Sequence, residues 1–108
     1  MAVPIRGGLP VVKRLTGVDT DGTSRNAGGP TSYIQISNEG AENLRVFFSQ
    51  ADFDADENYL ELAATSGYYE GPAEIGATSP NAIGREAVYV KAAANTTDCT
   101  IVFYVRRA

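Results

Sequence analysis

The order of apolar and polar positions predicts short β-strands from residue 33 onward. Residues 33–37 (YIQIS) alternate apolar and polar side chains, and residues 43–49 (NLRVFFS) place Leu44, Val46 and Phe48 on one face. A period of two is typical of strands that bury one face. Because a short turn containing glycine separates these two runs, we expect them to pair as an antiparallel hairpin.

Similar runs follow along the rest of the chain. Residues 67–75 read as one strand interrupted at Pro72, and a proline inside a strand suits a sheet edge or a bulge. Residues 50–58 and 76–85 read as an acidic loop and a long connection. The remaining expected strands are residues 59–63, 87–92 and 100–106.

The last of these strands is apolar on both faces. Ile101, Phe103 and Val105 alternate with Val102 and Tyr104. One face of a small sandwich usually meets water, so Val102 and Tyr104, together with Phe47, are expected to be covered by a partner. The alternative is that the N-terminal part of the same chain covers them.

Six or seven short strands and no run that predicts a helix of ten or more residues define the fold class. We expect an all-β protein: a small antiparallel β-sandwich or jelly-roll-like barrel. The 108 residues are enough for one hydrophobic core.

The first 32 residues differ in composition from the rest. They contain three of the five prolines and six of the eleven glycines, which interrupt any helix or strand period. We therefore divide the chain into an extended arm, residues 1–32, and a β-sandwich domain, residues 33–108, which should fold without the arm. Ordering such an arm costs at least about 1 kcal/mol per residue in backbone entropy, which its few apolar side chains can offset only if nearly all of them are covered. We therefore expect the arm to lie on a neighbouring subunit rather than on its own small domain, with a disordered tail as the alternative.

The expected assembly interface combines the arm with the outward faces of the strands. Its members are Ile5, Leu9, Val11, Val12, Arg14, Phe47, Val102 and Tyr104.

Composition and charge narrow the possible functions. The chain has no histidine, so a Ser-His-Asp or Cys-His nucleophile and a His-ligated metal are excluded. The net charge of −4 argues against a general nucleic-acid partner. No segment is apolar enough to span a membrane or to act as a secretory signal, so we expect a soluble protein made in the cytoplasm. The single cysteine, Cys99, is expected to be a reduced, buried thiol.

The acidic loop has one feature of a Ca²⁺ site. Asp52, Asp54 and Asp56 alternate as at the start of an EF-hand loop, but Glu57 stands where that loop needs glycine and Ala63 where it needs a bidentate glutamate. We interpret the loop as a solvated acidic surface. We expect no catalytic, cofactor-binding or metal-ligating residues, and no enzyme activity.

The six tyrosines, including the adjacent Tyr68 and Tyr69, allow a second reading. Tyrosine rings stack on sugars and also anchor protein interfaces. A carbohydrate-binding module is therefore the alternative function, although tryptophan, the strongest sugar-stacking residue, is absent.

Three segments together resemble small bacteriophage virion proteins of β-sandwich fold. They are residues 33–49 (YIQISNEGAENLRVFFS), 59–75 (YLELAATSGYYEGPAEI) and 87–105 (AVYVKAAANTTDCTIVFYV). The resemblance implies a non-enzymatic capsid decoration or cement protein located in the virion, with a tail or fibre-attachment subunit as its near neighbour. The implied partners are the major capsid protein or other virion proteins and copies of the chain itself, a trimer being the expected homo-oligomer.

The strand pattern generates a first testable prediction. Phe103 lies mid-strand on the face shared by Ile101 and Val105, so Phe103→Ala should lower the free energy of unfolding by about 3 to 5 kcal/mol. Urea denaturation checks this value. A Phe103→Ala protein of near-native stability would mean that the inward face of this strand is assigned the wrong way round.

Overall fold

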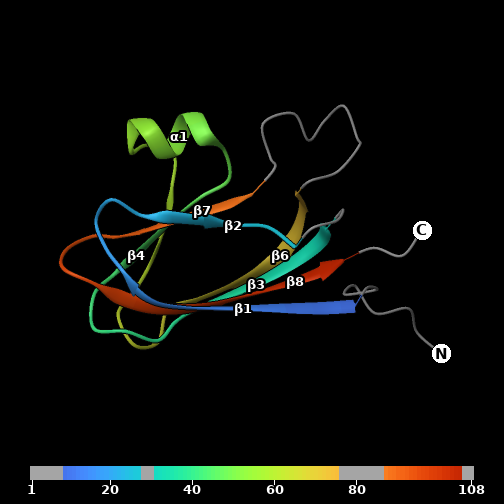
Figure 1. The fold of residues 1–108 in the computed structure, drawn as a ribbon, viewed down its shortest axis with the longest axis horizontal. Helices are drawn as coiled ribbons and strands as arrows, with labels where there is room; N and C mark the ends of the chain where they lie inside the picture. Colours follow the sequence, from blue (N-terminus) through green and yellow to red (C-terminus); the bar gives the residue numbers. More distant parts are fainter. Residues whose placement is uncertain (1–8, 28–30, 76–86, 106–108) are drawn as a thin grey trace.

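In the computed structural model, which describes residues 9–27, 31–75 and 87–105, two four-stranded antiparallel sheets face each other (Figure 1). The predicted β-sandwich is confirmed. Sheet A has the strand order β1 (Leu9–Val18), β8 (Thr97–Val105), β3 (Thr31–Asn38) and β6 (Tyr68–Ile75). Sheet B has the order β2 (Thr23–Arg25), β7 (Val88–Ala92), β4 (Leu44–Phe47) and β5 (Leu60–Leu62).

The core lies between the two inner faces. From sheet A, alternate residues of β3 and β8 point inward, and Ile36, Ile101 and Phe103 have no exposed surface. From sheet B, Leu44 and Val46 meet them, as the alternation of apolar positions predicts. The inward assignment of Phe103 is therefore confirmed.

The N-terminal segment does not form an arm where the structure describes it. β1 pairs antiparallel with β8 over most of its length, and β2 pairs with β7. Both strands therefore belong to the sandwich of their own chain, and residue 33 is not the start of the folded part. Residues 1–8 lie outside the described residues.

Residues 9–15 are the one part of the first 32 residues whose sequence favours regular structure, but β1 was not expected in the sandwich, and it has the features of a protected edge. Its inward-facing row, which pairs with Phe103, Ile101 and Cys99, contains the charged Lys13. The register also shifts before Val18, where Gly17 has a positive φ of 66°. An inward-pointing charge and a bulge both hinder edge-to-edge pairing of sheets, and both hide the apolar period of the strand.

The expected hairpin between residues 33–37 and 43–49 is wrong. β3 lies in sheet A between β8 and β6, whereas β4 lies in sheet B between β7 and β5. The alternation correctly separates the faces of each strand but does not specify which strand is its neighbour. The short connection after β3 therefore carries the chain from one sheet to the other.

Asn38, at the end of β3, organises this change of sheet. Its buried side chain is 1% exposed, and Nδ2 lies 2.8 Å from the carbonyl oxygen of Glu42, 3.1 Å from that of Leu62 and 3.0 Å from that of Ala63. Oδ1 accepts a hydrogen bond of 2.8 Å from the hydroxyl of Thr97. One amide thus joins β3, β5 and β8 at the same end of the sandwich.

The prediction for Pro72 is confirmed. β6 is the edge strand of sheet A, and its register against β3 shifts close to the Pro72 pairing with Tyr33. The long connection expected at residues 76–85 lies outside the described residues.

The segment expected as an acidic loop begins with a short helix, α1 (Gln50–Ala55), which lies over sheet B (Figure 1). The Ser49 hydroxyl accepts a hydrogen bond from the Asp52 amide, which caps the helix N-terminus. The helix ends where Asp56 adopts a left-handed conformation with φ of 54°. This helix of six residues is the one helix in the described part of the chain, and it is far too short to span a bilayer.

Because β1 and β2 are edge strands of the two sheets, they generate the second prediction. Deleting residues 1–32 removes an edge strand from each sheet and the first two residues of β3, and exposes the inward faces of β8 and β7. We expect this truncated protein to lose its cooperative unfolding transition in calorimetry, since the surviving strands would leave core side chains such as Phe103 open to water.

Deleting residues 1–8, which removes no described strand, is the matched control and should preserve the transition. A cooperatively folded protein that lacks residues 1–32 would show that β1 and β2 are dispensable additions to a smaller domain.

Candidate functional site

The outer face of sheet A carries exposed apolar and aromatic side chains, among them Val12 and Tyr68. Partner residues in antiparallel strands point to the same side of a sheet, so the registers of β1, β3, β6 and β8 specify which side chains share this face. The described side chains are Val12, Arg14, Tyr33, Gln35, Ser37, Tyr68, Glu70, Thr100, Val102 and Tyr104.

One half of this face, over β1 and β8, has an apolar pair beside Arg14 and Thr100. Val12 lies directly opposite Val102 in the antiparallel pair, and 56% of Val12 is exposed. Val102 and Tyr104 are half-buried. Exposed apolar side chains that cluster on one sheet face are typical of a surface that another molecule covers.

The other half, over β3 and β6, is made of tyrosines held by polar partners. The Tyr104 hydroxyl donates to Oε1 of Gln35 at 3.0 Å, and the ring packs edge-on against that of Tyr33 with centroids 6.0 Å apart. The hydroxyls of Tyr33 and Tyr68 both donate to the carboxylate of Glu70, at 2.5 and 2.8 Å. These bonds orient the rings, and 51% of Tyr68 remains exposed.

The structure brings four of the eight expected interface residues together on this face: Val12, Arg14, Val102 and Tyr104. Leu9 is exposed, but it belongs to the opposite row of β1 with Val11, which packs against the core. Ile5 lies outside the described residues.

Phe47 is the clear correction among the expected interface residues. It has no exposed surface, because α1 covers the outer face of sheet B. Its ring meets Phe53 of α1 edge-on at 5.5 Å and Tyr59 at 5.3 Å. The partner of Phe47 is therefore a segment of its own chain that the sequence analysis took for a loop.

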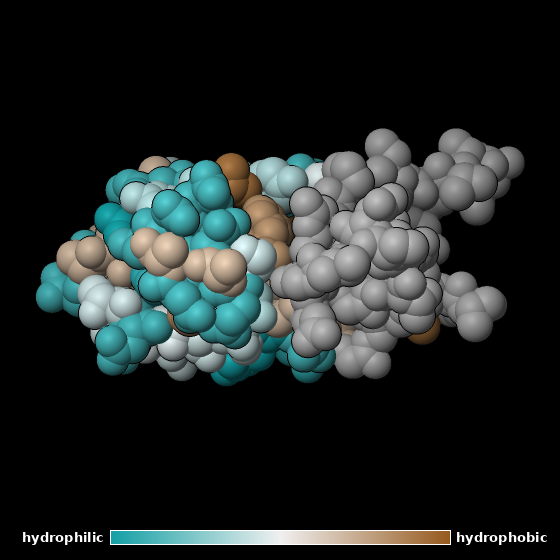
Figure 2. Space-filling model, turned by 90° about the horizontal axis from the view of Figure 1, so that it is seen from above, coloured by the Kyte–Doolittle hydropathy of each residue, from teal (hydrophilic) through white to brown (hydrophobic). Residues whose placement is uncertain are grey.

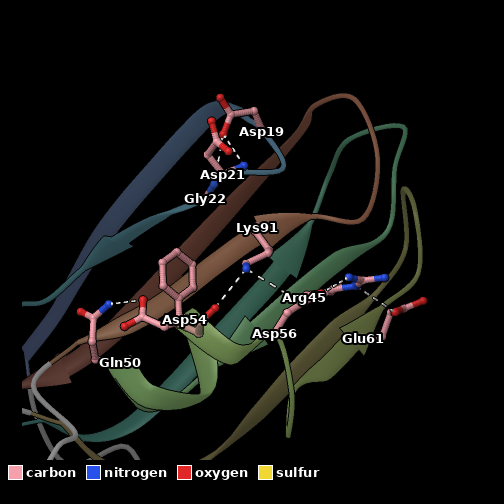
Figure 3. A network of polar contacts seen from close by, with 10 residues as sticks. Asp19, Asp21, Gly22, Arg45, Gln50, Asp54, Asp56, Glu61 and Lys91 are labelled. Atoms are coloured by element: carbon pink, nitrogen blue, oxygen red, sulfur yellow. Dashed lines mark hydrogen bonds and ion pairs between the residues drawn. The ribbon is translucent and has the colours of Figure 1, made fainter.

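Two cations, Lys91 and Arg45, lie against the aromatic cluster of Phe47, Phe53 and Tyr59 (Figure 3). The Lys91 ammonium donates to the Phe53 carbonyl at 3.0 Å and lies 4.6 Å from the centroid of the Phe53 ring. Nη1 of Arg45 lies 2.9 Å from Oδ2 of Asp56, while its Nε is 3.6 Å from Glu61 and has no hydrogen-bond partner. Cation–aromatic contacts and ion pairs thus hold α1 against the sheet.

The sequence analysis did not predict that the three tyrosines lie together, or that Lys91 contacts Phe53, because these contacts depend on which strands are neighbours. Tyr33, Tyr68 and Tyr104 are up to 71 positions apart in the chain, and each lies on a different strand of sheet A. The one available indication was that Tyr33 and Tyr104 each lie on the face of their strand opposite to the inward apolar residues.

The surface on the α1 side has a different character. Figure 2 looks onto that side and shows a described surface that is mostly hydrophilic, with small separate apolar spots. The two faces of the sandwich are therefore unequal, since the exposed Val12 lies beside the half-buried Val102 on sheet A and sheet B is capped by a polar helix.

The three alternating aspartates do not point to a common centre. Asp52 accepts a hydrogen bond from Asn58, Asp54 accepts one from Gln50, and Asp56 pairs with Arg45 and Lys91. Within residues 9–27, 31–75 and 87–105, no three His, Cys, Asp or Glu side chains are grouped so as to hold a metal ion.

Cys99 is a buried thiol, as expected, and lies in the main core cluster. Burial, with smaller effects from the carboxylates of Glu39 and Asp98, raises the pKa of this thiol to about 12, and the positive charge of Arg25 acts in the opposite direction. A thiol with so high a pKa is almost wholly protonated near neutral pH and is a poor nucleophile.

Comparison of the chain with protein-family models, curated proteins and solved structures found no match. The resemblance of residues 33–105 to bacteriophage virion proteins therefore stays a prediction.

The separate partners of the three aspartates generate the third prediction. Millimolar Ca²⁺ should leave the melting temperature within about 1 °C of its value without Ca²⁺, because a ligand stabilises a fold only by binding the native state. Differential scanning calorimetry with Mg²⁺ at the same ionic strength as control measures this. A rise of many degrees that Asp54→Ala abolishes would establish a Ca²⁺ site.

Proposed function

We propose that this chain is a non-enzymatic structural protein of a virus particle, a bacteriophage decoration or cement protein that attaches to the head through the outer face of sheet A. A position in the tail or at a fibre attachment point is the neighbouring possibility. The observation that supports the proposal is the inequality of the two outer faces. One is sealed by α1 and its paired cations, and the other exposes Val12 beside Val102.

The chemistry of the exposed face suits attachment to another protein. Its centre is apolar and aromatic, while Gln35 and Glu70 supply polar groups beside it. Interface centres enriched in tyrosine and surrounded by polar groups are common in protein complexes. In this proposal the partners are the major capsid protein or other virion proteins, and copies of the chain meet on the lattice as a homo-oligomer.

The fourth prediction tests the attachment surface. Val12→Asp places a charge on the exposed half of the face, where its desolvation on binding is costly, and should weaken binding to capsids that lack the chain by at least about tenfold. Capsids of the phage that encodes the chain are mixed with the purified protein, and bound protein is measured after sedimentation.

Ala51→Asp is the matched control, because it introduces the same charge at an exposed position of α1, on the other side of the sandwich. It should bind as the unchanged chain does. Equal binding by both variants would contradict attachment through sheet A, and no binding by the unchanged chain would contradict the decoration function.

A second candidate function, a carbohydrate-binding module, is favoured by one specific observation. The exposed Tyr68 shares a sheet face with Tyr104, the carboxylate of Glu70 and the amide of Gln35, and the buried Tyr33 lies between them. Sugar sites commonly combine aromatic rings with such hydrogen-bonding groups. Saturable binding to a glycan array that Tyr68→Ala abolishes would favour this function over capsid attachment.

A further inference from the structure

A polar pocket opens between β1 and β2, away from the tyrosines of sheet A. These two strands are edge strands of different sheets, and the pocket lies where the edges of the sandwich meet. It has a volume of about 310 Å³ and is lined by residues 14–19 of β1 and its turn, and by Gly22, Thr23 and Arg25. Arginine and threonine give it several hydrogen-bond donors.

The direction of the Arg25 side chain follows from the pairing of β2 with β7. Thr23 pairs with Val90 and Arg25 with Val88, and both valines are buried members of the core between the sheets. Thr23 and Arg25 therefore project toward sheet A. The effect of the Arg25 charge on Cys99 of β8 is consistent with this direction.

The guanidinium of Arg25 is anchored on one side and open on the other. Nη1 donates to the Thr23 hydroxyl at 2.9 Å and to the Ser24 carbonyl at 2.7 Å, and both acceptors are uncharged. Among the described residues, Nε and Nη2 have no hydrogen-bond or ion-pair partner. This is the edge of the fork that binds carboxylate or phosphate oxygens in pairs.

The charges around the pocket do not neutralise Arg25. Asp19 lines the pocket, but its Oδ1 accepts hydrogen bonds of 3.0 and 3.1 Å from the amides of Asp21 and Gly22 in its own turn (Figure 3). Oδ1 of Asp98 accepts a hydrogen bond of 2.9 Å from the backbone amide of Gly17. Within the described residues neither carboxylate forms an ion pair with Arg25. Arg14 also lines the pocket, but the register places its side chain on the outer face of sheet A.

Arg25 differs in this respect from the two cations beneath α1. Arg45 and Lys91 pair with carboxylates beneath α1, although the protein is acidic overall and has carboxylates near Arg25 as well. Arg25 is anchored through Nη1, and its Nε and Nη2 donors face a polar pocket without a partner among the described residues. This arrangement suits an acceptor from outside the chain.

We propose that the pocket between β1 and β2 is a binding site for an oxyanion, a carboxylate or phosphate group held by the Nε and Nη2 edge of Arg25. The group would belong to a small anion or to an acidic side chain of a partner protein. Arg25 itself lies on sheet B, so the proposed anion-binding group is not part of the attachment face, although Arg14 lies beside both.

The fifth prediction is a titration of the ¹⁵N-labelled full chain with inorganic phosphate and with acetate at constant ionic strength, followed by amide chemical shifts. The amides of Thr23, Ser24 and Arg25 should shift saturably with at least one of the two anions, and those of α1 should not shift. Sodium chloride at the same ionic strength is the control for screening.

Arg25→Gln removes the charge and the fork and should weaken this binding at least about tenfold. Thr23→Val keeps the charge but removes the anchor, and should weaken binding less. If phosphate alone saturates, a free or bound phosphate group is the ligand, and if acetate saturates, a side-chain carboxylate of a partner fits. The absence of saturable shifts with both anions, or equal shifts in Arg25→Gln, would overturn the proposal.

Discussion

The buried amide of Asn38 is the polar constraint on which the arrangement of the sandwich depends. It lies where the chain leaves sheet A for sheet B, and its side chain hydrogen-bonds to the carbonyl of Leu62 in β5, to that of Ala63 just after β5, and to the hydroxyl of Thr97, the first residue of β8. An unsatisfied buried amide is costly, so alternative registers that break these bonds are disfavoured. Since a slip of one residue turns every side chain of a strand to the opposite face, the register that Asn38 favours also decides which residues of β3 and β8 face outward.

That register produces two unequal outer faces. Over sheet B, α1 places Phe53 against Phe47, and Lys91 and Arg45 join the helix to the sheet by charge. Gly22 has room for no side chain there, because a Cβ atom would lie 2.7 Å from the Phe53 ring. Sheet A has no such cover among the described residues over Val12, and this asymmetry is the basis of the proposed attachment.

The sequence was a good guide to fold class and to the faces of single strands. Phe103 and Ile101 point inward as their alternation predicts, and Pro72 lies on an edge strand. Such properties depend on a side chain and its near neighbours in the chain.

What the sequence did not show depends on contacts between distant segments. The hairpin expected after β3 fails because Asn38 binds β5 and β8, and β1 was hidden by Lys13 and a bulge at its protected edge. The burial of Phe47 required knowing that Phe53 would lie over it. Some of the expected interface residues, among them Val12 of β1 and Val102 of β8, do share the outer face of sheet A. Their neighbours Tyr33 and Tyr68 come from β3 and β6, and the order of these strands in the sheet is known only from the fold.

A cryo-electron microscopy reconstruction of decorated heads tests the central claim most directly, because the orientation of the sandwich in the added density can be read from α1. The account predicts that sheet A faces the capsid, with Val12 and Tyr104 at the contact and α1 directed to solvent. Density in which α1 faces the capsid and the outer face of sheet A is open to solvent would contradict it.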